Sequence, residues 1–400
     1  MMAALYAAKE GASVTILERN EKLGKKIYIT GKGRCNVTND CDREAFLSQV
    51  PRNPRFLYGA LALLPTNALM EMLQSAGCPL TVERGRRVFP QSNKASDVTK
   101  TLSSELRRSN VQVRLNARVK SLIVKDARVR GIQLESGEML LADAVILATG
   151  GKSYPVTGST GDGYRLAQEA GHTLTPLQPS LAPLVASESW VGELAGLSLK
   201  NVRLSAKCQG KVVYSEQGEM LFTHFGISGP LTLEMSSHLI ACPPETWRVT
   251  LDLKPALTPE QLEARLLRDF AQMSRKQFSN LLPGLLPGKL ADIFPRLLGI
   301  PGVKPVHQIS REERQRLKTL LKELPLPISG IRPIEEAIVT RGGIPVKEIS
   351  PATMESKLAP GLYFAGEMID VDAHTGGFNL HIAFSTGALA GKSAALNVAN

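Results

Sequence analysis

An acidic residue at the end of a short β-branched segment is the first feature of this chain that could hold a ligand. Glu18 closes the stretch SVTILE, after a small-residue helical segment and a turn at Gly11. In a βαβ unit that binds a dinucleotide, an acid at this place accepts hydrogen bonds from ribose hydroxyls and disfavours a 2′-phosphate. Taken alone the signal is weak, because an acid after a strand is usually a surface residue.

The next segment, ITGKGRCNVTN, suits close approach of the backbone to phosphate groups. Gly31 and Gly33 permit tight contact, and Lys25, Lys26 and Arg34 supply positive charge nearby. A solvated, lysine-rich loop is the alternative interpretation.

Two apolar segments, VILATGG and LYFAGE, end in glycine and are typical of buried strands that open onto a ligand. We expect Thr149, Gly150 and Gly151 to lie near an adenosine, and Gly366 and Glu367 to face a ribityl chain. A tight turn without a ligand is the alternative for either segment alone.

A glycine pair, Gly376 and Gly377, begins the last helical segment. The amino end of a helix carries partial positive charge and stabilises an anion. A reduced flavin is negatively charged at its N1/C2 carbonyl edge, so this end would favour the reduced state. Together, these features indicate a bound dinucleotide.

The elements that must position these residues form an interrupted α/β domain. Helical patterns cover residues 55–77 and 94–110, and period-2 patterns typical of antiparallel strands begin near residue 174. A helical, charged region follows, and strand patterns then return. The predicted parts are an FAD-binding domain in two pieces, an inserted antiparallel β-barrel-like part, a helical subdomain and return strands of the insertion: 1–173 and 346–400, 174–256, 257–325, and 326–345.

Composition limits the possible classes of protein. The 400 residues are 43% hydrophobic and 21% charged, which is typical of a globular protein with more than one domain. The five cysteines show no Cys-x-x-Cys pair and no regular framework, which argues against structural zinc, a dithiol centre and a disulfide scaffold. We expect no bound metal and a reducing, cytoplasmic setting. No uncharged apolar run approaches the roughly 20 residues of a membrane span.

The net charge of +11 raises the question of an anionic partner. Lysine and arginine are spread along the chain, with only short clusters such as RGRR at 84–87, and aromatic residues make up 5%. We therefore expect small-molecule, often phosphorylated, ligands rather than nucleic acid or a membrane. The sequence does not define the oligomeric state.

The motifs LGKKIYITGKGRCNVTN, VILATGGKSYPVTGSTGDGYRLAQEAGH, LFTHFGISGPLTLEMS and GLYFAGEMIDVDAHTGGFNLHIAFSTG occur in this order. Over essentially its whole length the chain resembles the bacterial BaiN-like flavoproteins, also labelled aminoacetone oxidase family FAD-binding enzymes. The resemblance implies the two-dinucleotide-binding-domain (Rossmann-like) fold and redox chemistry on small organic molecules linked to NAD(P)H or oxygen. It implies FAD contacts at Glu18, Arg34, Asn36, Val119, Thr149, Gly150, Gly366, Glu367, Gly377 and Asn379. The rest of the candidate cofactor-binding set is Arg19, Lys25, Gly31, Gly33, Cys35, Gly151, Gly376 and Phe378.

The first residues depart from the family's pattern. Members of the family begin with an apolar strand and a Gly-x-Gly-x-x-Gly loop, and MMAALYAAKEGA corresponds to the helix that follows that loop. The loop cradles the pyrophosphate, so its absence puts FAD affinity in question. We expect the natural start to lie about 15 residues upstream, the length of a strand and a loop.

No catalytic residue is assigned from the sequence. His224 and His374 lie in glycine-rich loops and are candidates for proton transfer, although a structural role is the better interpretation. Cys35 has no cysteine partner nearby and is interpreted as a packing residue. Hydride transfer itself requires no protein acid or base.

The expected function is that of an FAD-dependent oxidoreductase that moves hydride between NADH or NADPH, or a small organic substrate, and flavin. One alternative is an FAD-dependent aminoketone or amine oxidase that produces peroxide. A second alternative is a basic flavin-fold binding protein without turnover. The substrate and the choice between NADH, NADPH and oxygen remain open at this point.

Overall fold

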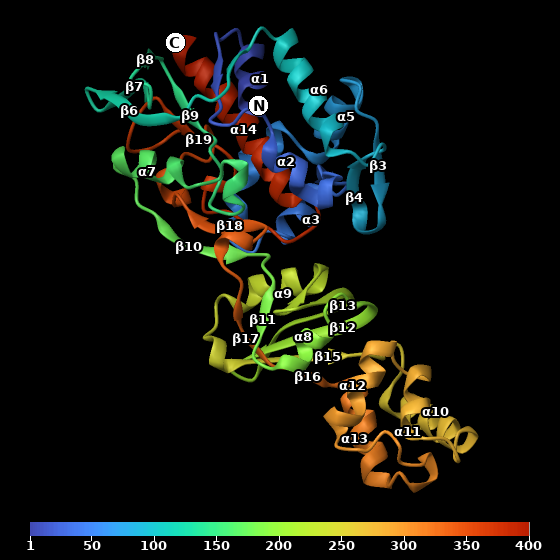
Figure 1. Cartoon of the computed structure of the whole chain (residues 1–400). Coiled ribbons are helices and arrows are strands. Elements are labelled where there is room, and N and C mark those ends of the chain that lie inside the picture. Colours follow the sequence, from blue (N-terminus) through green and yellow to red (C-terminus); the bar gives the residue numbers. More distant parts are fainter. Residues whose placement is uncertain (400) are drawn as a thin grey trace. The chain divides into compact units, whose positions relative to one another are not determined.

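The structure is a computed structural model that describes residues 1–399, and the chain divides into two compact units. Unit 1 comprises Met1–Ser180 together with the segment that begins at Ile334, and unit 2 comprises Leu181–Pro333. Both ends of the chain thus contribute to unit 1, and the middle of the chain forms unit 2 (Figure 1). The predicted insertion, residues 174–345, extends beyond unit 2 at both ends, because strands β10 (Thr175–Ser180) and β18 (Val339–Gly343) pair with each other within unit 1.

Unit 1 combines helices with short strands. Its helices are α1 (Met2–Lys9), α2 (Lys25–Ile29), α3 (Arg43–Ser48), α4 (Tyr58–Leu63), α5 (Thr66–Ser75), α6 (Ala95–Arg108), α7 (Asp162–Glu169) and α14 (Phe378–Ala399). Its strands are β1 (Thr15–Leu17), β2 (Thr38–Asn39), β3 (Leu80–Glu83), β4 (Arg87–Pro90), β5 (Gln112–Arg114), β6 (Val119–Lys125), β7 (Arg128–Leu134), β8 (Met139–Leu141), β9 (Val145–Leu147), β10 (Thr175–Ser180), β18 (Val339–Gly343) and β19 (Leu362–Phe364).

Two parallel strand pairs carry the candidate ligand-binding turns of unit 1. β1 pairs with β5, and β9 pairs with β19. The remaining strands form antiparallel sheets in the orders β2-β4-β3 and β6-β7-β8, and the pair β10-β18. Parallel pairs joined through helices are typical of a Rossmann-like α/β fold, as the sequence predicts.

Helix α1 packs directly against α14, which crosses the middle of unit 1 (Figure 1). Small residues allow this close approach: a Cβ added to Gly391 would lie 2.0 Å from the carbonyl oxygen of Ala3. Ala4 and Ala7 of α1 are buried as well. The small-residue character of the first and last helices therefore reflects their mutual packing.

One stretch of unit 1, Pro54–Ser75, has the length and hydropathy of a membrane span. It is interrupted around Pro65, because α4 ends at Leu63 and α5 begins at Thr66, and Leu57, Leu69 and Leu73 are buried in the interior of unit 1. These contacts are those of a core element.

Unit 2 contains a seven-stranded antiparallel sheet and six helices. The strands, in the order of the sheet, are β16 (Leu324–Leu326), β15 (Trp247–Asp252), β12 (Ser198–Cys208), β13 (Lys211–Thr223), β14 (Gly226–Ser228), β11 (Leu184–Ala186) and β17 (Ile328–Ile331). The helices are α8 (Ser189–Glu193), α9 (Pro230–Leu239), α10 (Pro259–Gln272), α11 (Phe278–Leu281), α12 (Gly288–Leu298) and α13 (Arg311–Lys322).

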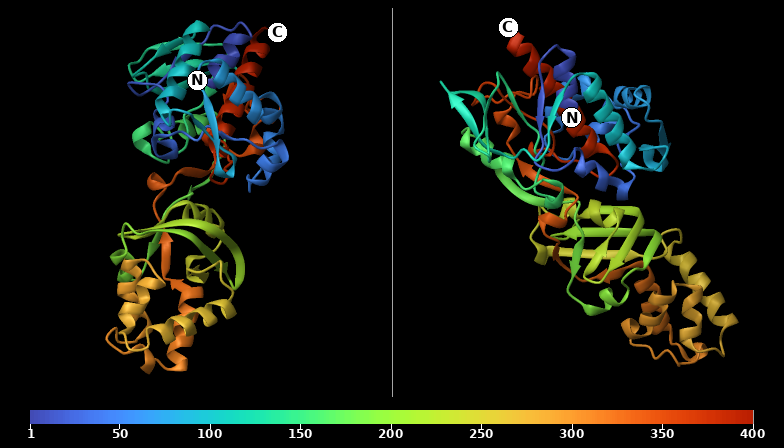
Figure 2. Two further views of the ribbon diagram at one scale, coloured as in Figure 1. Left: turned by 90° about the vertical axis from the view of Figure 1, so that its right-hand side faces the viewer. Right: turned by 45° about the horizontal axis from the view of Figure 1, so that its top comes forward.

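The sheet of unit 2 is curved but open (Figure 2). β16 and β17 are its two edges, and they do not pair with each other in the described part of the chain. The antiparallel sheet that the sequence predicts for the insertion is therefore confirmed, and within residues 1–399 it does not close into a barrel. Alternating strand patterns show that strands are antiparallel and half-buried, but they do not show whether the edges close.

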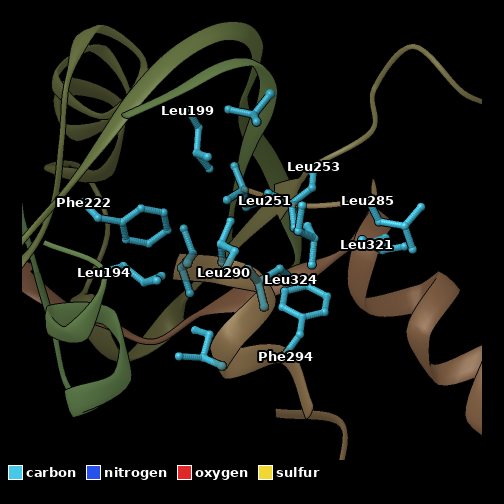
Figure 3. Packing of buried hydrophobic residues seen from close by; sticks show 14 of the residues in the cluster. Leu194, Leu199, Phe222, Leu251, Leu253, Leu285, Leu290, Phe294, Leu321 and Leu324 are labelled. Atoms are coloured by element: carbon cyan, nitrogen blue, oxygen red, sulfur yellow. The ribbon is translucent and has the colours of Figure 1, made fainter. Parts of the chain in front are cut away.

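One continuous hydrophobic core joins the sheet and the helices of unit 2. Leu199, Phe222 and Leu251 on the sheet, together with Leu290 and Phe294 on α12, belong to this buried cluster (Figure 3). The predicted helical subdomain 257–325 therefore shares its core with the strands.

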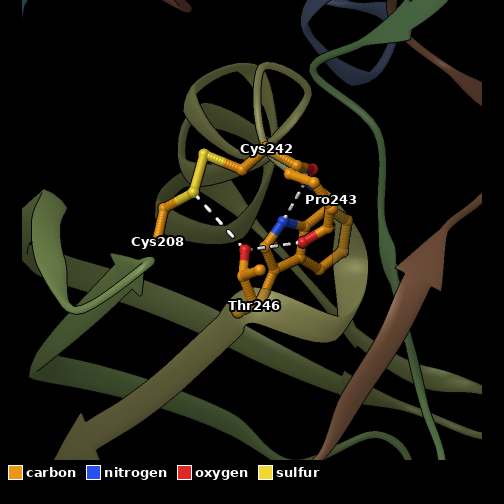
Figure 4. Close-up of a disulfide and its surroundings, with 5 residues drawn as sticks. Cys208, Cys242, Pro243 and Thr246 are labelled. Carbon is orange, nitrogen blue, oxygen red and sulfur yellow. Dashed lines mark hydrogen bonds between the residues drawn. A yellow bond between two sulfur atoms is a disulfide. The ribbon is translucent and has the colours of Figure 1, made fainter.

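A disulfide joins Cys208, at the end of β12, to Cys242, which follows α9 (Figure 4). Trp247 lies beside this bond and donates from Nε1 to the carbonyl oxygen of Cys242 at 3.1 Å. The sequence analysis missed this pair, because a separation of 34 residues matches no motif, and the two cysteines meet only in the fold, where β15 places Trp247 opposite Cys208.

Candidate functional site

The two predicted strand-to-glycine junctions meet in unit 1. Leu147 of β9 lies opposite Phe364 of β19, and the backbone N–H of Ala365 donates to the carbonyl oxygen of Leu147 at 3.0 Å. Because the strands are parallel, the turns Thr149–Gly151 and Gly366–Glu367 leave the sheet at the same end. The carboxyl ends of parallel strands are where α/β folds bind ligands.

The Glu367 carboxylate organises this end of the strands. Its Oε1 accepts hydrogen bonds from the Ser153 hydroxyl at 2.8 Å and from the Thr340 backbone N–H at 2.7 Å. The Lys26 ammonium lies 3.4 Å from its Oε2 and also donates to the Ser153 hydroxyl at 2.6 Å. Glu367 thus holds the turn in place. The candidate contact with a ligand at this turn is the backbone of Gly366, which has no side chain.

Two glycines of the candidate set allow backbone contacts that a side chain would prevent. A Cβ on Gly151 would lie 2.3 Å from the Thr340 hydroxyl oxygen. Gly377 has φ +98°, and its Cβ would lie 2.4 Å from the Thr38 carbonyl oxygen and 2.9 Å from Asn36 Oδ1. The structure therefore brings Asn36 beside Gly377, as a shared cofactor site requires.

The loop before α14 is held by Asn379. Its Oδ1 accepts from the Ala373 N–H at 2.9 Å, and its Nδ2 donates to the Ala373 carbonyl oxygen at 2.7 Å. Phe378 is the first residue of α14, so Gly376 and Gly377 immediately precede the amino end of the helix. This places partial positive charge at the loop.

The residues around this loop fit the isoalloxazine of FAD chemically. Asn36 Oδ1 is buried and has no hydrogen-bond partner in the described part of the chain, so an acceptor is available there. A flavin offers an N–H donor on its pyrimidine ring and carbonyl oxygens that the amino end of a helix can stabilise. An orphaned acceptor beside a glycine-lined helix start is consistent with such a ligand.

His381, a residue that the sequence analysis missed, supports the same loop from within the core. Its Nδ1 lies 3.0 Å from the Thr38 hydroxyl, and its Nε2 lies 3.0 Å from the Leu64 carbonyl oxygen. Burial lowers the pKa of the imidazole to about 4. The ring is therefore neutral at pH 7, with Nε2–H donating to Leu64 and Nδ1 accepting from Thr38. The only signal in the sequence was a histidine in the first turns of an apolar helix.

Glu18 follows β1 at the other parallel pair. Its Oε1 accepts from the backbone N–H and from the Nδ2 of Asn20, both at 2.8 Å, which leaves Oε2 for a further donor such as a ribose hydroxyl. Lys25 pairs with Glu21 at 2.8 Å. Arg19 is engaged by Asp162 at 3.0 Å, so its charge is neutralised within the protein.

Other members of the candidate set have local partners. Arg34 pairs with Glu83, and its guanidinium lies 4.2 Å from the centre of the Phe89 ring. Cys35 is fully buried, and burial raises the pKa of its thiol to about 12, so the side chain packs and only its backbone can reach a cofactor. Val119 begins β6 opposite Leu134. Gly31 and Gly33 lie exposed on the loop after α2.

A second polar cluster, which the sequence analysis also missed, surrounds the segment between β19 and α14. Arg52 pairs with Asp370 at 3.0 Å, and the Ser180 hydroxyl donates to Asp372 Oδ2 at 2.9 Å. Burial raises the pKa of Asp372, and the hydrogen bond from Ser180 and the charge of Arg341 oppose that shift. The signal was present as two acids in the otherwise apolar run MIDVDA.

The two candidate histidines belong to different units. His374 lies in the loop before α14, where burial lowers the pKa of its imidazole. His224 lies between β13 and β14 of unit 2, with its ring against Phe225. Residues 1–399 contain no group of three or more His, Cys, Asp or Glu side chains arranged to hold a metal ion.

The parallel pairs, the acid after β1 and the glycine turns at the ends of β9 and β19 are typical of a Rossmann-like fold that binds a dinucleotide. The sequence family described as "HI0933-like protein Rossmann domain" matches residues 1–393. The chain belongs to this family of BaiN-like flavoproteins.

Characterised relatives align along nearly the whole chain. The 3-dehydro-bile acid delta(4,6)-reductase of Clostridium scindens is 33% identical over 99% of this chain and 96% of its own length. The ribosomal RNA dihydrouridine synthase of Haemophilus influenzae is 31% identical over 96% of this chain and 93% of its own length. The corresponding enzyme of Escherichia coli is 30% identical over the same shares.

Solved structures share the fold at low sequence identity. The open conformation of a flavocytochrome c3 fumarate reductase has a TM-score of 0.51 at 18% identity, covering 100% of this chain and 76% of that chain. A 3-ketosteroid delta1-dehydrogenase from Sterolibacterium denitrificans has a TM-score of 0.50 at 14% identity, covering 99% of this chain and 97% of that chain.

Proposed function

We propose that this protein is an FAD-dependent reductase that adds two hydrogens across a carbon–carbon double bond conjugated to a carbonyl group, with NADH or NADPH as electron source. One observation carries the proposal. Relatives that are 30–33% identical over nearly the whole chain are named for a reduction of this kind. A delta(4,6) 3-oxo steroid and a uracil ring both contain a double bond conjugated to a carbonyl group. The names differ in substrate, but both reactions reduce a carbon–carbon double bond that is conjugated to a carbonyl group.

The site chemistry supports this reaction class. Bound FAD supplies the two-electron chemistry. The amino end of α14 and Asn36 are suited to hold the pyrimidine edge, and the Glu367 network fixes Gly366, where the cofactor chain would pass close to the backbone. Glu18 is suited to hold a ribose, and its charge favours a hydroxyl over a phosphate there.

The reaction balances when the nicotinamide is the reductant. NAD(P)H gives up a hydride equivalent, the β-carbon of the substrate receives one, and the α-carbon receives a proton from the protein or from water. His374 is a poor proton donor at neutral pH, because the lowered pKa of its imidazole keeps it uncharged. Its neutral ring is better suited to orient a substrate carbonyl through an N–H donor.

The test is an anaerobic spectroscopic titration of the purified protein reconstituted with FAD. We expect a bound-flavin spectrum, bleaching by NADH or NADPH, and return of the oxidised spectrum when a steroid 4-en-3-one or a uridine-containing RNA is added. A flavin that neither nicotinamide bleaches, or that no conjugated acceptor restores, would contradict the proposal.

The same experiment separates the two alternatives. Bleaching by an aminoketone without nicotinamide, followed by peroxide formation in air, would instead support the oxidase. Failure to bind FAD under any condition would favour a binding protein without turnover.

A further inference from the structure

A depression on the surface of unit 1 lies outside the candidate cofactor set. It has a volume of about 310 Å³ and lies between the segment that leads into α2, the helix α6 and the strand β5. Its lining includes Lys22, Tyr28, Lys100, Arg107 and Val113. No residue assigned to the cofactor lines it. The volume is at the lower end of the range for small-molecule sites, which is enough for one nucleotide-sized group.

The depression concentrates positive charge. Lys22, Lys100 and Arg107 line it, and no carboxylate does. The acids adjacent in sequence are engaged elsewhere, because Glu21 pairs with Lys25 and Glu105 pairs with Arg108.

The three cations are themselves weakly neutralised. Lys100 has only Asp97, at 4.0 Å, and Arg107 makes no ion pair within residues 1–399. The Lys22 ammonium lies 4.6 Å from the centre of the Tyr28 ring, a cation–π contact. Three cations that line one depression, with a single long ion pair among them, attract a multiply charged anion such as a phosphate.

The rest of the lining is apolar and aromatic. Val113 and Leu115 are 38% and 41% exposed, and Tyr28 lines the same depression. The Ser103 hydroxyl adds a neutral donor. A flat ring can stack on a tyrosine and contact exposed aliphatic groups while its phosphate lies among lysines and arginines. A plain inorganic anion would leave this apolar part unused.

We propose that the depression is a binding site for a nucleoside phosphate, with the phosphate held by Lys22, Lys100 and Arg107 and the base placed against Tyr28. The inference adds a binding site to the proposed reductase: an RNA ligand would deepen that proposal, whereas a free nucleotide would be a ligand apart from it. A nucleotide within a single-stranded RNA and a free nucleotide share this chemistry, and the experiment distinguishes them.

The test measures binding of fluorescein-labelled oligouridylate by anisotropy, with uridine monophosphate as competitor, over a series of salt concentrations. The test variant is the double substitution Lys100→Gln with Arg107→Gln, both on exposed side chains that can change without loss of folding. The matched control is Arg108→Gln. Arg108 is the next residue of α6, is exposed and pairs with Glu105, but it does not line the depression.

We expect the double variant to bind at least about tenfold more weakly at low salt, and the dependence of log affinity on log salt to become shallower by roughly 0.7 for each lost phosphate contact. The control should bind as the unmodified protein does. Tighter binding of the oligonucleotide than of the monophosphate assigns the site to RNA, and equal binding per nucleotide assigns it to a free nucleotide.

The proposal is wrong if neither probe binds near physiological salt, or if the double variant and the control bind alike. Reduction of the steroid enone by the same variants is measured in parallel. Since these residues lie outside the cofactor set, that rate reports on the reductase independently of nucleotide binding.

Discussion

Units 1 and 2 differ in what they bury. The core of unit 2 is almost wholly apolar, and the polar side chains that it buries in the described part of the chain are hydroxyl groups only: Thr232, Ser236 and Ser237. Unit 1 buries carboxyl and imidazole groups as well. They are His172, Glu348, Asp370, Asp372 and His381.

This difference indicates that the core of unit 2 serves stability, whereas unit 1 also holds the groups of the candidate site. A buried ionisable group costs free energy unless partners compensate it, so such groups are uncommon in ordinary cores. In unit 1, His381, Asp370 and Asp372 flank the glycine loop before α14, where FAD chemistry is expected. Unit 2 has no comparable cluster among its described residues, and its stability rests on hydrophobic burial.

The largest expected effect is on stability, and it tests whether unit 2 depends on its hydrophobic core. Phe294 of α12 is fully buried in the unit 2 core (Figure 3). Truncation in Phe294→Ala should cost about 3–5 kcal/mol of unfolding free energy. Chemical denaturation followed by circular dichroism measures this cost, and the flavin content per chain should stay unchanged. Leu267→Ala is the control, because Leu267 is 47% exposed and should change little. Loss of flavin from Phe294→Ala alone would show that the core of unit 2 also maintains the cofactor site.

The next effect concerns the buried imidazole of unit 1. The pKa of His381 is lowered from 6.5 to about 4 by burial, so the unfolded chain binds a proton in this interval that the folded chain does not. Its contribution to stability is complete above pH 6.5 and is lost as the pH falls toward 4, a change of about 3 kcal/mol. Urea denaturation between pH 4 and 7 should therefore show a steeper decline for the unmodified protein than for His381→Gln. The exposed His307 in His307→Gln provides the control, and equal slopes in all three proteins would refute the assignment.

The sequence was sufficient for features that depend on neighbouring residues. The short motifs VILATGG and LYFAGE each predict a buried strand followed by a glycine turn. The structure contains both, as β9 and β19 with their turns. The interruption of the α/β domain was also visible, because strand periodicity changes near residue 174.

Features that depend on distant partners could not be read in this way. The charge of Arg34 suggested a phosphate contact, and Arg19 belonged to the candidate cofactor-binding set, but Glu83 and Asp162, far along the chain, pair with these two arginines in the fold. His381 was invisible for the same reason, since its partners Thr38 and Leu64 are more than 300 residues away.

A smaller effect is expected at the carboxylate that anchors the Gly366 turn. In Glu367→Gln, the charge-assisted bonds from Ser153 and Thr340 weaken and Lys26 loses its counter-ion, which should cost about 1.5–3 kcal/mol of unfolding free energy. FAD titration should show weaker binding, because the turn next to the cofactor becomes less well held. Glu169→Gln alters an exposed helix pair with Arg165 and should leave both quantities unchanged. A stable Glu367→Gln protein with normal FAD affinity would mean that the network is dispensable.

The smallest effect on stability gives the sharpest test of where the cofactor lies. Gly366 has φ +76°, but the nearest atom to an added Cβ is Ala383 Cβ at 3.5 Å, an ordinary contact. Within the protein, Gly366→Ala therefore costs only the left-handed backbone conformation, roughly 1–2 kcal/mol. If the ribityl chain passes over this backbone, the same methyl group should nevertheless prevent FAD binding, which flavin absorbance per chain measures. Gly137→Ala is the control, because Gly137 also has a positive φ and no atom within 4 Å of an added Cβ. The substitution should cost the same backbone free energy but lies outside the candidate cofactor set. Equal flavin content in the two variants would place the cofactor away from the end of β19.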